Sequence, residues 1–318
     1  MSENRQPARG FITVATGGAK YYMMAHTLLL SYRLASADPL PFAILCDREN
    51  RWTRDFDDVV ILEKPARSYM DKLELLVHSP YDETIFIDSD CIAFRDLNRL
   101  WDSFQNATDF SSVGWVHPLD STEGWFTREG AGKYADQLEY LHFFHGGIYY
   151  IRKGETCERV YELAKDVAAH YYEFKFRLFK NPADETVLSL ASALCGCKPI
   201  LWEEWMISLI GGTTYTKLDF FQRELTYLSK RRSAGPNPPA IDGILLHFGS
   251  GQYDSPQYLL ESRKVMFEHR RGRHWNAAER ALNLAFCQVL YVVIRNCRKV
   301  GRPVKNWIKR RKKARRAR

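Results

Sequence analysis

The sequence lacks several features that would assign it to large classes of proteins. Its seven cysteines form no paired framework: Cys195 and Cys197 are one residue apart, and no second CxxC or HxxxH pair completes a zinc site. No apolar run of signal-peptide type follows the first ten residues, so we expect a protein that is not secreted and keeps its thiols reduced. The glycines at 17–18 are not followed by a GxxxxGK[ST] motif, which excludes a P-loop.

Long apolar runs are also missing. The longest nearly uninterrupted one, residues 284–294, is shorter than the roughly 20 residues that a membrane-spanning helix needs. The composition, 45% apolar and 14% aromatic over 318 residues, is that of a globular protein with room for one large core and a small appendage.

Acidic residues are absent from residues 295–318, which contain 13 Lys and Arg. The whole chain has 46 bases and 38 acids, so the first 294 residues hold 33 bases and carry a charge of about −5. The net charge of +8 therefore comes from a basic terminal arm. An acidic body does not favour a nucleic-acid-binding core.

Apolar runs alternate with helical patterns in the first part of the chain. Strands are predicted at 11–16, 41–47, 59–63 and 83–88, with helices at 21–35 and around 69–79. This alternation predicts an α/β domain with a mixed, mostly parallel sheet flanked by helices, in which ligands bind at the carboxyl ends of strands. Further along, the pattern predicts a strand at 146–152, helices at 154–174 and 183–194, a surface loop at 231–240 and a strand at 244–251.

The character of the chain changes near residue 270. We expect one large globular domain at 1–270 and a helical, strongly basic segment at 271–318. Asn276 and Glu279 have capping-box spacing, and the helix that they begin should run to about residue 299, where Gly301 and Pro303 would end it. In the segment beyond, Val304, Trp307 and Ile308 should share one face.

Two carboxylates follow the predicted strand IFI. Asp88 and Asp90 are one residue apart, so in an extended backbone their side chains point the same way and repel each other unless a cation lies between them. Mg²⁺ and Mn²⁺ prefer such oxygen ligands together with substrate phosphates. The alternative is a solvated turn.

Four other residues each have a functional and a purely structural interpretation. His247 ends a strand before Phe248-Gly249 and is either a metal ligand that favours Mn²⁺ or a core histidine. Asp184 and Glu185 are either carboxylates beside a reacting carbon or acids favoured by a helix N-terminus. Lys72 either pairs with phosphate or is a surface cation.

Five ordered blocks resemble the GT-A glycosyltransferases, and most closely the retaining group that includes glycogenin and the lipopolysaccharide galactosyl- and glucosyltransferases. The blocks are FITVATGGAKYY, YDETIFIDSDCIAFRDLNRLW, FFHGGIYYI, ADETVLSLA and LLHFGSG, and they span residues 11 to about 255. The resemblance implies a GT-A fold, a Rossmann-like fold of nucleotide-diphospho-sugar transferases. It also implies metal-dependent transfer of a hexose from a UDP-sugar, with retention, to a glycan or lipid-linked acceptor.

The resemblance also implies roles for individual residues. Asp88, Asp90 and His247 would hold Mn²⁺ (or Mg²⁺) against the diphosphate, and Glu185, with Asp184, would act at the sugar carbon. The donor pocket would be formed by Ala15, Thr16, Tyr21, Lys72, Asp88, Ser89, Asp90, Gly146, Gly147 and Gly249, with Tyr21 near the uracil.

This chain departs from the family pattern at two places. His145 stands where family members often have Asn. The family commonly has Gly-x-x-Lys-Pro-Trp after the metal histidine, whereas this chain has GSGQYDSPQY, so the phosphate-binding lysine has no direct equivalent. Arg263 and Lys264 are the nearest candidates to replace it.

The basic arm 295–318 is expected to bind an anionic membrane surface, which would place the protein on the cytoplasmic face of a membrane as a peripheral protein. A disordered basic tail is the alternative. Three other functions stay open: a nucleotidyltransferase, a sugar-nucleotide-binding protein without transferase activity, and a nucleic-acid-associated protein that uses the arm.

Overall fold

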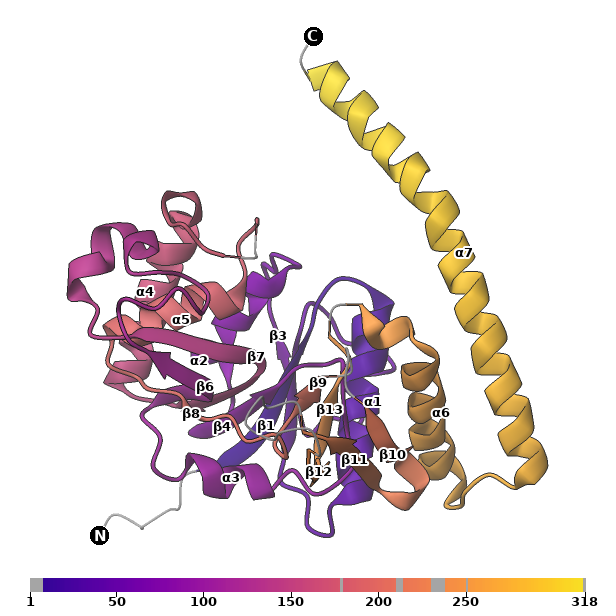
Figure 1. Cartoon of the computed structure of the whole chain (residues 1–318). Coiled ribbons are helices and arrows are strands. Elements are labelled where there is room, and N and C mark those ends of the chain that lie inside the picture. Colours follow the sequence, from indigo (N-terminus) through magenta and orange to yellow (C-terminus); the bar gives the residue numbers. More distant parts are fainter. Residues whose placement is uncertain (1–7, 178–179, 210–213, 230–237, 250, 317–318) are drawn as a thin grey trace.

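The computed structural model describes residues 8–177, 180–209, 214–229, 238–249 and 251–316, with side chains described up to Cys297. A seven-stranded sheet with the order β3-β2-β1-β4-β7-β6-β8 forms its centre (Figure 1). The strands are β1 (Arg9–Ala15), β2 (Phe42–Cys46), β3 (Asp58–Ile61), β4 (Glu83–Ile87), β6 (Phe110–His117), β7 (Leu141–Arg152) and β8 (Ile200–Leu201). β7 is antiparallel to its neighbours β4 and β6, and the other pairs are parallel. The predicted mixed, mostly parallel sheet is confirmed.

Helices cover both faces of this sheet (Figure 1). The α-helices are α1 (Ala19–Ala35), α2 (Leu75–His78), α3 (Arg99–Phe104), α4 (Glu155–Ala169), α5 (Asp184–Leu194), α6 (Pro256–Arg271) and α7 (Ala277–Arg316). The short 3₁₀ helices are η1 (Tyr69–Glu74), η2 (Glu129–Gln137), η3 (Tyr171–Glu173), η4 (Phe220–Gln222) and η6 (Gln252–Asp254). The helices predicted from periodicity are present, with boundaries shifted by a few residues.

Strand β1 shows how the sequence forms two cores. Phe11 packs with α1 and α3 on one face of the sheet, whereas the next residue, Ile12, packs with α4 and α5 on the other face. Successive side chains of a strand point to opposite faces, and both residues are fully buried. A continuous apolar run such as FITVA is therefore what a central strand covered on both sides requires.

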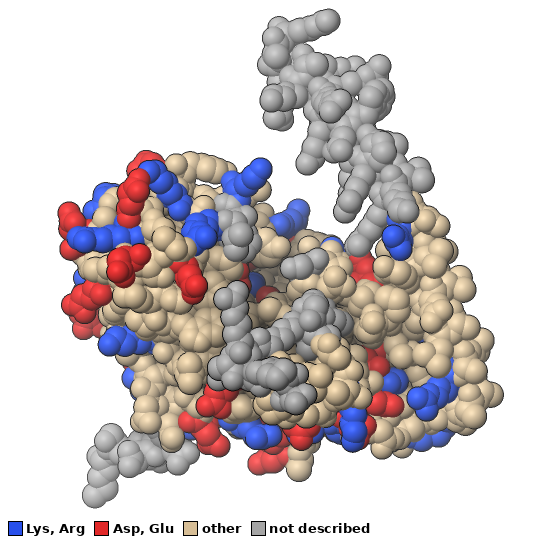
Figure 2. All heavy atoms as spheres, in the orientation of Figure 1, with Lys and Arg blue, Asp and Glu red and all other residues tan. Residues whose placement is uncertain are grey.

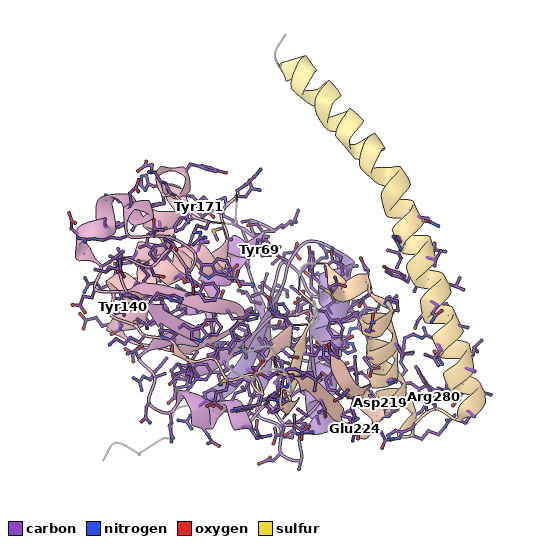
Figure 3. All side chains as sticks on the ribbon, in the orientation of Figure 1. Tyr69, Tyr140, Tyr171, Asp219, Glu224 and Arg280 are labelled. Atoms are coloured by element: carbon purple, nitrogen blue, oxygen red, sulfur yellow. The ribbon has the colours of Figure 1, made fainter. Side chains whose placement is uncertain are left out.

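Two small sheets complete the body. The first contains β5 (Cys91–Ala93), β13 (Leu245–His247) and β9 (Ser208–Leu209), with β13 antiparallel to β5. The second contains β10 (Tyr215–Asp219), β11 (Glu224–Leu228) and β12 (Ala240–Asp242). Figure 3 labels Asp219 and Glu224 of this second sheet, and Asp219 forms an ion pair with Lys264 of α6 over 2.9 Å. Most of the loop predicted at 231–240 lies outside the described residues.

Helix α7 begins as predicted and ends later than predicted. The Asn276 N–H donates to Glu279 and the Glu279 N–H donates to the Asn276 side chain, each over 2.9 Å, which confirms the capping box. The prediction of an end near residue 299 was wrong, because α7 continues through Gly301 and Pro303 to Arg316. A proline keeps a helical φ and removes one hydrogen bond, so a helix that is already nucleated, with Arg302 before the proline and Lys305 after it, can continue past it. The side chains of Val304, Trp307 and Ile308 lie outside the described ones.

The first half of α7 presents apolar side chains to the outside. Ala277–Cys297 is long and apolar enough to cross a membrane, judged by length and composition alone, and 11% of its most apolar window is buried. Sequence analysis counted only the nearly uninterrupted apolar run 284–294 and so underestimated the length of the apolar helix, because a helix of this kind tolerates isolated polar residues. Leu282 is 72% exposed and Val289 64%. Figure 2 shows mostly uncharged atoms along this part of α7, whereas acids and bases are interspersed on the visible face of the body.

Candidate functional site

The acidic turn after β4 is built by backbone hydrogen bonds. The Asp88 N–H donates to the carbonyl of Gly147 over 3.0 Å, and the Cys91 N–H donates to the carbonyl of Asp88 over 3.1 Å. The chain then enters β5, whose Cys91 pairs with His247 of β13. The Phe248 N–H also donates to the Asp90 carbonyl over 2.9 Å. This pairing brings the distant histidine to the two aspartates.

The three predicted metal ligands lie together. His247 Nε2 is 3.0 Å from Asp90 Oδ1 and 3.6 Å from Asp88 Oδ2. The ligand atoms of Asp90, Cys91 and His247 all lie within 4.8 Å of one another. The Cys91 thiol is fully buried, and Mg²⁺ and Mn²⁺ prefer oxygen ligands to thiolate, so Cys91 suits such a cation poorly. Two carboxylates and one imidazole remain, a donor set that fits a divalent cation.

Lys72 forms the positive centre of a second group of residues. Its Nζ lies 2.9 Å from Asp88 Oδ2 and 3.1 Å from Asp184 Oδ2, and it donates to the Gly146 carbonyl over 3.2 Å. The Tyr149 hydroxyl also donates to Asp184 Oδ2. Lys72 is 8% exposed, so the interpretation as a surface cation is wrong. Its ammonium pairs with one buried carboxylate, that of Asp184, and one partly buried carboxylate, that of Asp88, and balances one of their two negative charges.

Glu185 contacts the glycine segment of β7. Its Oε1 accepts a hydrogen bond from the Gly146 N–H over 2.7 Å. A Cβ atom on Gly146 would lie 2.3 Å from Glu185 Cγ, and one on Gly147 would lie 2.6 Å from the His145 ring. Both positions therefore require glycine for steric reasons. Asp184 and Glu185 lie in the first turn of α5, where the helix N-terminus favours negative charge. The two interpretations of these acids are therefore compatible, because the same position also places them beside Lys72 and Gly146.

The buried charges shift one another's pKa values. Burial by itself lowers the pKa of His247, but Asp90 and Asp88 outweigh it and the net shift is upward. Burial would raise the pKa of Asp90, yet His247 brings it below its usual value. For Asp88, burial is the larger effect and the pKa is raised despite Lys72. Burial lowers the pKa of Lys72, and Asp184 and Asp88 reverse this to a net rise.

The pKa of Glu185 is strongly raised, as is that of Glu261 in α6. Burial, and then the negative charge of Asp184, raise the pKa of Glu185 to about 7, although the Gly146 N–H works in the opposite direction. A carboxyl group with such a pKa changes its charge near neutral pH, which is a common property of residues in active sites.

The end of β1 forms the other side of the site. Ala15 is buried, and the Thr16 hydroxyl donates to Asp71 Oδ2 over 2.6 Å. Tyr21, on the first turn of α1, is 37% exposed. The Gly17 N–H donates to Asp47 Oδ2 over 3.2 Å. These residues line the strand ends where a ligand of an α/β sheet binds.

Sequence analysis missed Asp47 and Asp71. Asp47 directly follows β2, so the rule that had singled out Asp88, a carboxylate at the carboxyl end of a parallel strand, could have found it. Asp71 comes from η1, which also supplies Lys72, and only the tertiary structure brings it to Thr16. Figure 3 labels Tyr69, from the same segment, in the upper middle of the view. Tyr69 is 61% exposed and its ring centroid lies 5.9 Å from Lys72 Nζ.

The remaining two donor-pocket candidates lie on the metal corner. Ser89 is buried between the two aspartates. A Cβ atom on Gly249 would lie 3.1 Å from the His247 ring, so the backbone passes close to the imidazole there. The two proposed replacements for the family lysine lie in α6: Lys264 pairs with Asp219 and Glu261, each over 2.9 Å, and Arg263 bonds to a side chain of α7.

A series of aromatic rings leads from the metal corner to the surface. The centroid of the His145 ring lies 5.2 Å from that of His247 and 4.7 Å from that of Trp202. Trp202 lies 5.1 Å from Trp115, which stacks on Phe143 at 5.5 Å and 27°. Trp115 is 37% exposed. No pattern in the sequence had indicated this arrangement, because its members come from β6, β7 and the segment after β8.

Comparison with known proteins identifies the fold. No protein-family model matches the chain, and no curated protein matches it in sequence. A crystal structure of the galactosyltransferase LgtC in complex with donor and acceptor sugar analogues is similar at a TM-score of 0.50 and 12% identity, over 89% of this chain and 95% of that chain. The apo structure of the bifunctional glycosyltransferase WbbM is similar at a TM-score of 0.50 and 14% sequence identity. The match covers 85% of this chain and 52% of the WbbM chain, so this chain spans about half the length of WbbM. The chain therefore has the GT-A fold of these glycosyltransferase structures.

Proposed function

We propose that this protein is a metal-dependent glycosyltransferase that moves a hexose from a UDP-hexose to a glycan or glycolipid acceptor with retention. The observation that carries the proposal is the group formed by Asp88, Asp90 and His247, with Lys72 and Glu185 beside it, at the carboxyl ends of the central strands. The shared fold supports it, since the similar structures are those of glycosyltransferases.

The negative charge on the leaving diphosphate is the main electrostatic problem of the reaction. A bound Mn²⁺ or Mg²⁺ held by Asp88, Asp90 and His247 would supply Lewis acidity at that diphosphate. The Lys72 ammonium lies between the carboxylates of Asp88 and Asp184 and reduces their mutual repulsion, so Asp88 stays in position to bind the metal. Ala15, Thr16 and Tyr21 would hold the nucleoside.

The sugar carbon becomes positive as the bond to phosphate breaks. Glu185 would place a carboxylate beside it, as nucleophile or as electrostatic partner, and Asp184 would orient the sugar. The hydrogen bond from the Gly146 N–H fixes the Glu185 side chain before the substrate binds. The absence of side chains at Gly146 and Gly147 leaves room for the Glu185 side chain and the His145 ring, which would both lie beside the sugar.

The exposed end of the aromatic series supports a carbohydrate acceptor. Sugars present apolar C–H faces, and an indole offers a flat apolar surface of similar size. Trp115 is the partly exposed member, and Trp202 and His145 join it to the metal corner. An acceptor sugar on Trp115 would therefore lie on the side of the site that leads to the transferred hexose.

The basic arm 295–318 would hold the enzyme at the cytoplasmic face of a membrane. Anionic lipids attract basic residues by about 1 kcal/mol each near the surface. The outward apolar residues of α7 that precede the arm support a membrane location. On this proposal, residues 271–318 form a membrane-association segment and 1–270 the catalytic domain.

A donor assay tests the proposal. UDP-glucose, UDP-galactose, GDP-mannose and a CMP-sugar are incubated with the full chain and Mn²⁺, with and without lactose, and nucleotide release is measured. We expect release from a UDP-hexose, loss of release in EDTA, and a loss of about 10² or more in Asp90→Ala. Asp242→Ala, an aspartate of β12 in the second small sheet, is the matched control.

Two outcomes would redirect the assignment. Tight binding of a UDP-sugar without any release or transfer would identify a sugar-nucleotide-binding protein instead. Full activity in EDTA would remove the metal from the scheme. The anomeric configuration of the product, measured by NMR, tests retention separately, because it does not depend on which sugar is transferred.

A further inference from the structure

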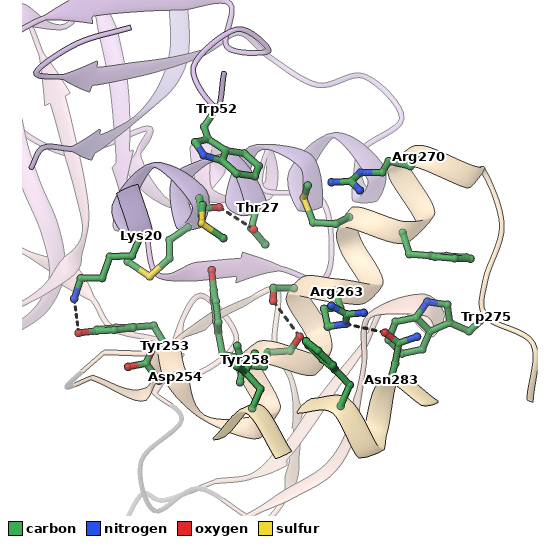
Figure 4. A pocket seen from close by; sticks show the side chains of 18 of the residues that line it. Lys20, Thr27, Trp52, Tyr253, Asp254, Tyr258, Arg263, Arg270, Trp275 and Asn283 are labelled. Carbon is green, nitrogen blue, oxygen red and sulfur yellow. Dashed lines mark hydrogen bonds between the residues drawn. The ribbon is translucent and has the colours of Figure 1, made fainter. Parts of the chain in front are cut away.

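A cavity lies between α1, α6 and the beginning of α7, and none of the predicted metal ligands lines it (Figure 4). Its volume is about 670 Å³, within the range of small-molecule sites. Of the residues named above for the donor, the metal or the acceptor, Arg263 alone lines it, and this candidate replacement for the family lysine donates to Asn283 of α7. Its walls are mostly apolar and include Met23, Met24, Met266, Phe267, Phe286 and Leu290.

The apolar walls come from three helices that meet without filling the space between them. Three methionines contribute to the walls, and methionine side chains adapt to ligands of irregular shape. Phe286 and Leu290 belong to the part of α7 whose outer side chains, such as Val289, are exposed. The cavity therefore lies directly under the helix that is apolar enough to meet a bilayer.

The rim of the cavity is cationic. Four bases, Arg263, Arg270, Arg271 and Lys20, and one acid, Asp254, line the cavity, so the formal charge of its lining is +3. Arg263 and Arg270 lie on the side of Trp275, and Lys20 donates to the Tyr253 hydroxyl over 2.7 Å at the other end, beside Asp254 (Figure 4). Within the part of the chain that the structure describes, no ion pair joins any of the three arginines to a carboxylate. Arg263 instead donates to Asn283 over 2.7 Å.

We propose that this cavity binds one amphiphile that has an apolar chain and a phosphate headgroup. The chain would lie against the methionines and Phe286, and the phosphate would be held at the rim by Arg270 and its neighbours. Guanidinium groups match phosphate oxygens in geometry and charge. A fully polar ligand would leave the apolar walls unused, and an uncharged lipid would leave the arginines unused.

The lipid phosphate would come from the adjacent bilayer. This site is separate from the donor site, and its existence does not depend on transferase activity. It also differs from the arm 295–318, because the arm would attract a whole anionic surface whereas the cavity holds a single molecule.

The test uses the full-length protein and n-dodecyl phosphate below its aggregation concentration, with isothermal titration calorimetry as the readout. We expect binding of one molecule per chain. n-Decyl phosphate should bind about tenfold more weakly, because two buried methylenes are lost. Inorganic phosphate and n-dodecyl maltoside should each bind at least about 30-fold more weakly than dodecyl phosphate, since each offers only half of the complementary chemistry.

Variants locate the binding. Met23→Trp fills the cavity from a half-exposed position and should abolish binding, and Arg270→Gln should weaken it about tenfold. Arg280→Gln, on α7 but outside the cavity lining, is the matched control and should bind like the wild type (Figure 3). Circular dichroism confirms that each variant is folded.

Three results would overturn the proposal. Equal affinity for inorganic phosphate would reduce the site to an anion site. Binding of many amphiphiles per chain, unaffected by Met23→Trp, would show adsorption on the outer face of α7. Wild-type affinity in Arg270→Gln, with no dependence on headgroup charge, would remove the role of the cationic rim.

Discussion

His247 Nε2 lies 3.0 Å from Asp90 Oδ1, although the two residues are far apart in the sequence. The antiparallel pairing of β13 with β5 produces this contact, since it places His247 opposite Cys91, the residue after Asp90. We therefore expect His247→Ala to weaken Mn²⁺ binding and to lower kcat for transfer by about 10². Electron paramagnetic resonance of free Mn²⁺ measures the affinity. His78→Ala, a histidine at the end of α2, is the control, and unchanged Mn²⁺ affinity in His247→Ala would contradict the metal site.

Lys72 should matter for stability as well as for activity. Lys72→Met leaves the buried Asp184 and the partly buried Asp88 without their shared cation, so we expect a loss of about 3 kcal/mol in the free energy of unfolding, measured by urea denaturation. Adding Asp184→Asn should recover part of the loss. Lys133, whose ion pair with Asp166 has the same 2.9 Å distance but is exposed, is the matched control, and Lys133→Met should have no measurable effect.

Glu185 makes stability depend on pH. Its pKa rises from 4.5 to about 7 on folding, so the folded protein holds this proton more tightly, and the wild type loses stability as the pH rises from about 4.5 to 7. Relative to the wild type, Glu185→Gln should gain about 3 kcal/mol between pH 4 and pH 8. The same variant should lose transfer activity. Urea denaturation in EDTA at the two pH values measures the gain, which the exposed Glu123→Gln should not show.

Trp115 should affect the acceptor and not the donor. Removal of a stacking surface worth about 1 kcal/mol should raise KM for the acceptor about fivefold in Trp115→Ala, with KM for the UDP-sugar unchanged. Trp115→Phe should restore most of the affinity. Tyr172→Ala, an aromatic residue that is 77% exposed, is the control. An equal rise of both KM values would mean that Trp115 supports the fold of the whole site.

The basic arm should determine binding to anionic membranes. The full chain should sediment with vesicles that contain phosphatidylserine and not with neutral ones, and high salt should release it. Truncation after Ile294 should abolish sedimentation while binding of dodecyl phosphate remains. Replacing the five bases at 309–313 by Gln gives a full-length comparison. Sedimentation of the truncated chain with both kinds of vesicle would show instead that the apolar part of α7 is sufficient.

The local signals in the sequence were sufficient for the elements and for part of the site. Apolar runs with period-2 or helical spacing predicted the central strands and helices, and the Asn276–Glu279 spacing predicted the cap of α7. The end of α7 was predicted wrongly, because Gly301 and Pro303 weaken a helix without forbidding it. The unfavourable helix propensities of one glycine and one proline do not determine where a long helix ends when most residues on both sides favour helix.

By itself the sequence determined which residues are buried in the sheet and that two carboxylates end β4, because strand periodicity and hydrophobicity act over a few residues. The tertiary structure decided two partners of those carboxylates, Lys72 from η1 and Asp184 from α5. His247 from β13 was predicted as a partner through the family resemblance alone, and the structure places it 3.0 Å from Asp90. The tertiary structure also decided that the rings of Trp115 and Trp202 lie in series with that of His145, and that α1, α6 and α7 enclose a cavity. Such arrangements depend on contacts between distant segments, and the energy of a contact is set by distance in space, which no local pattern encodes.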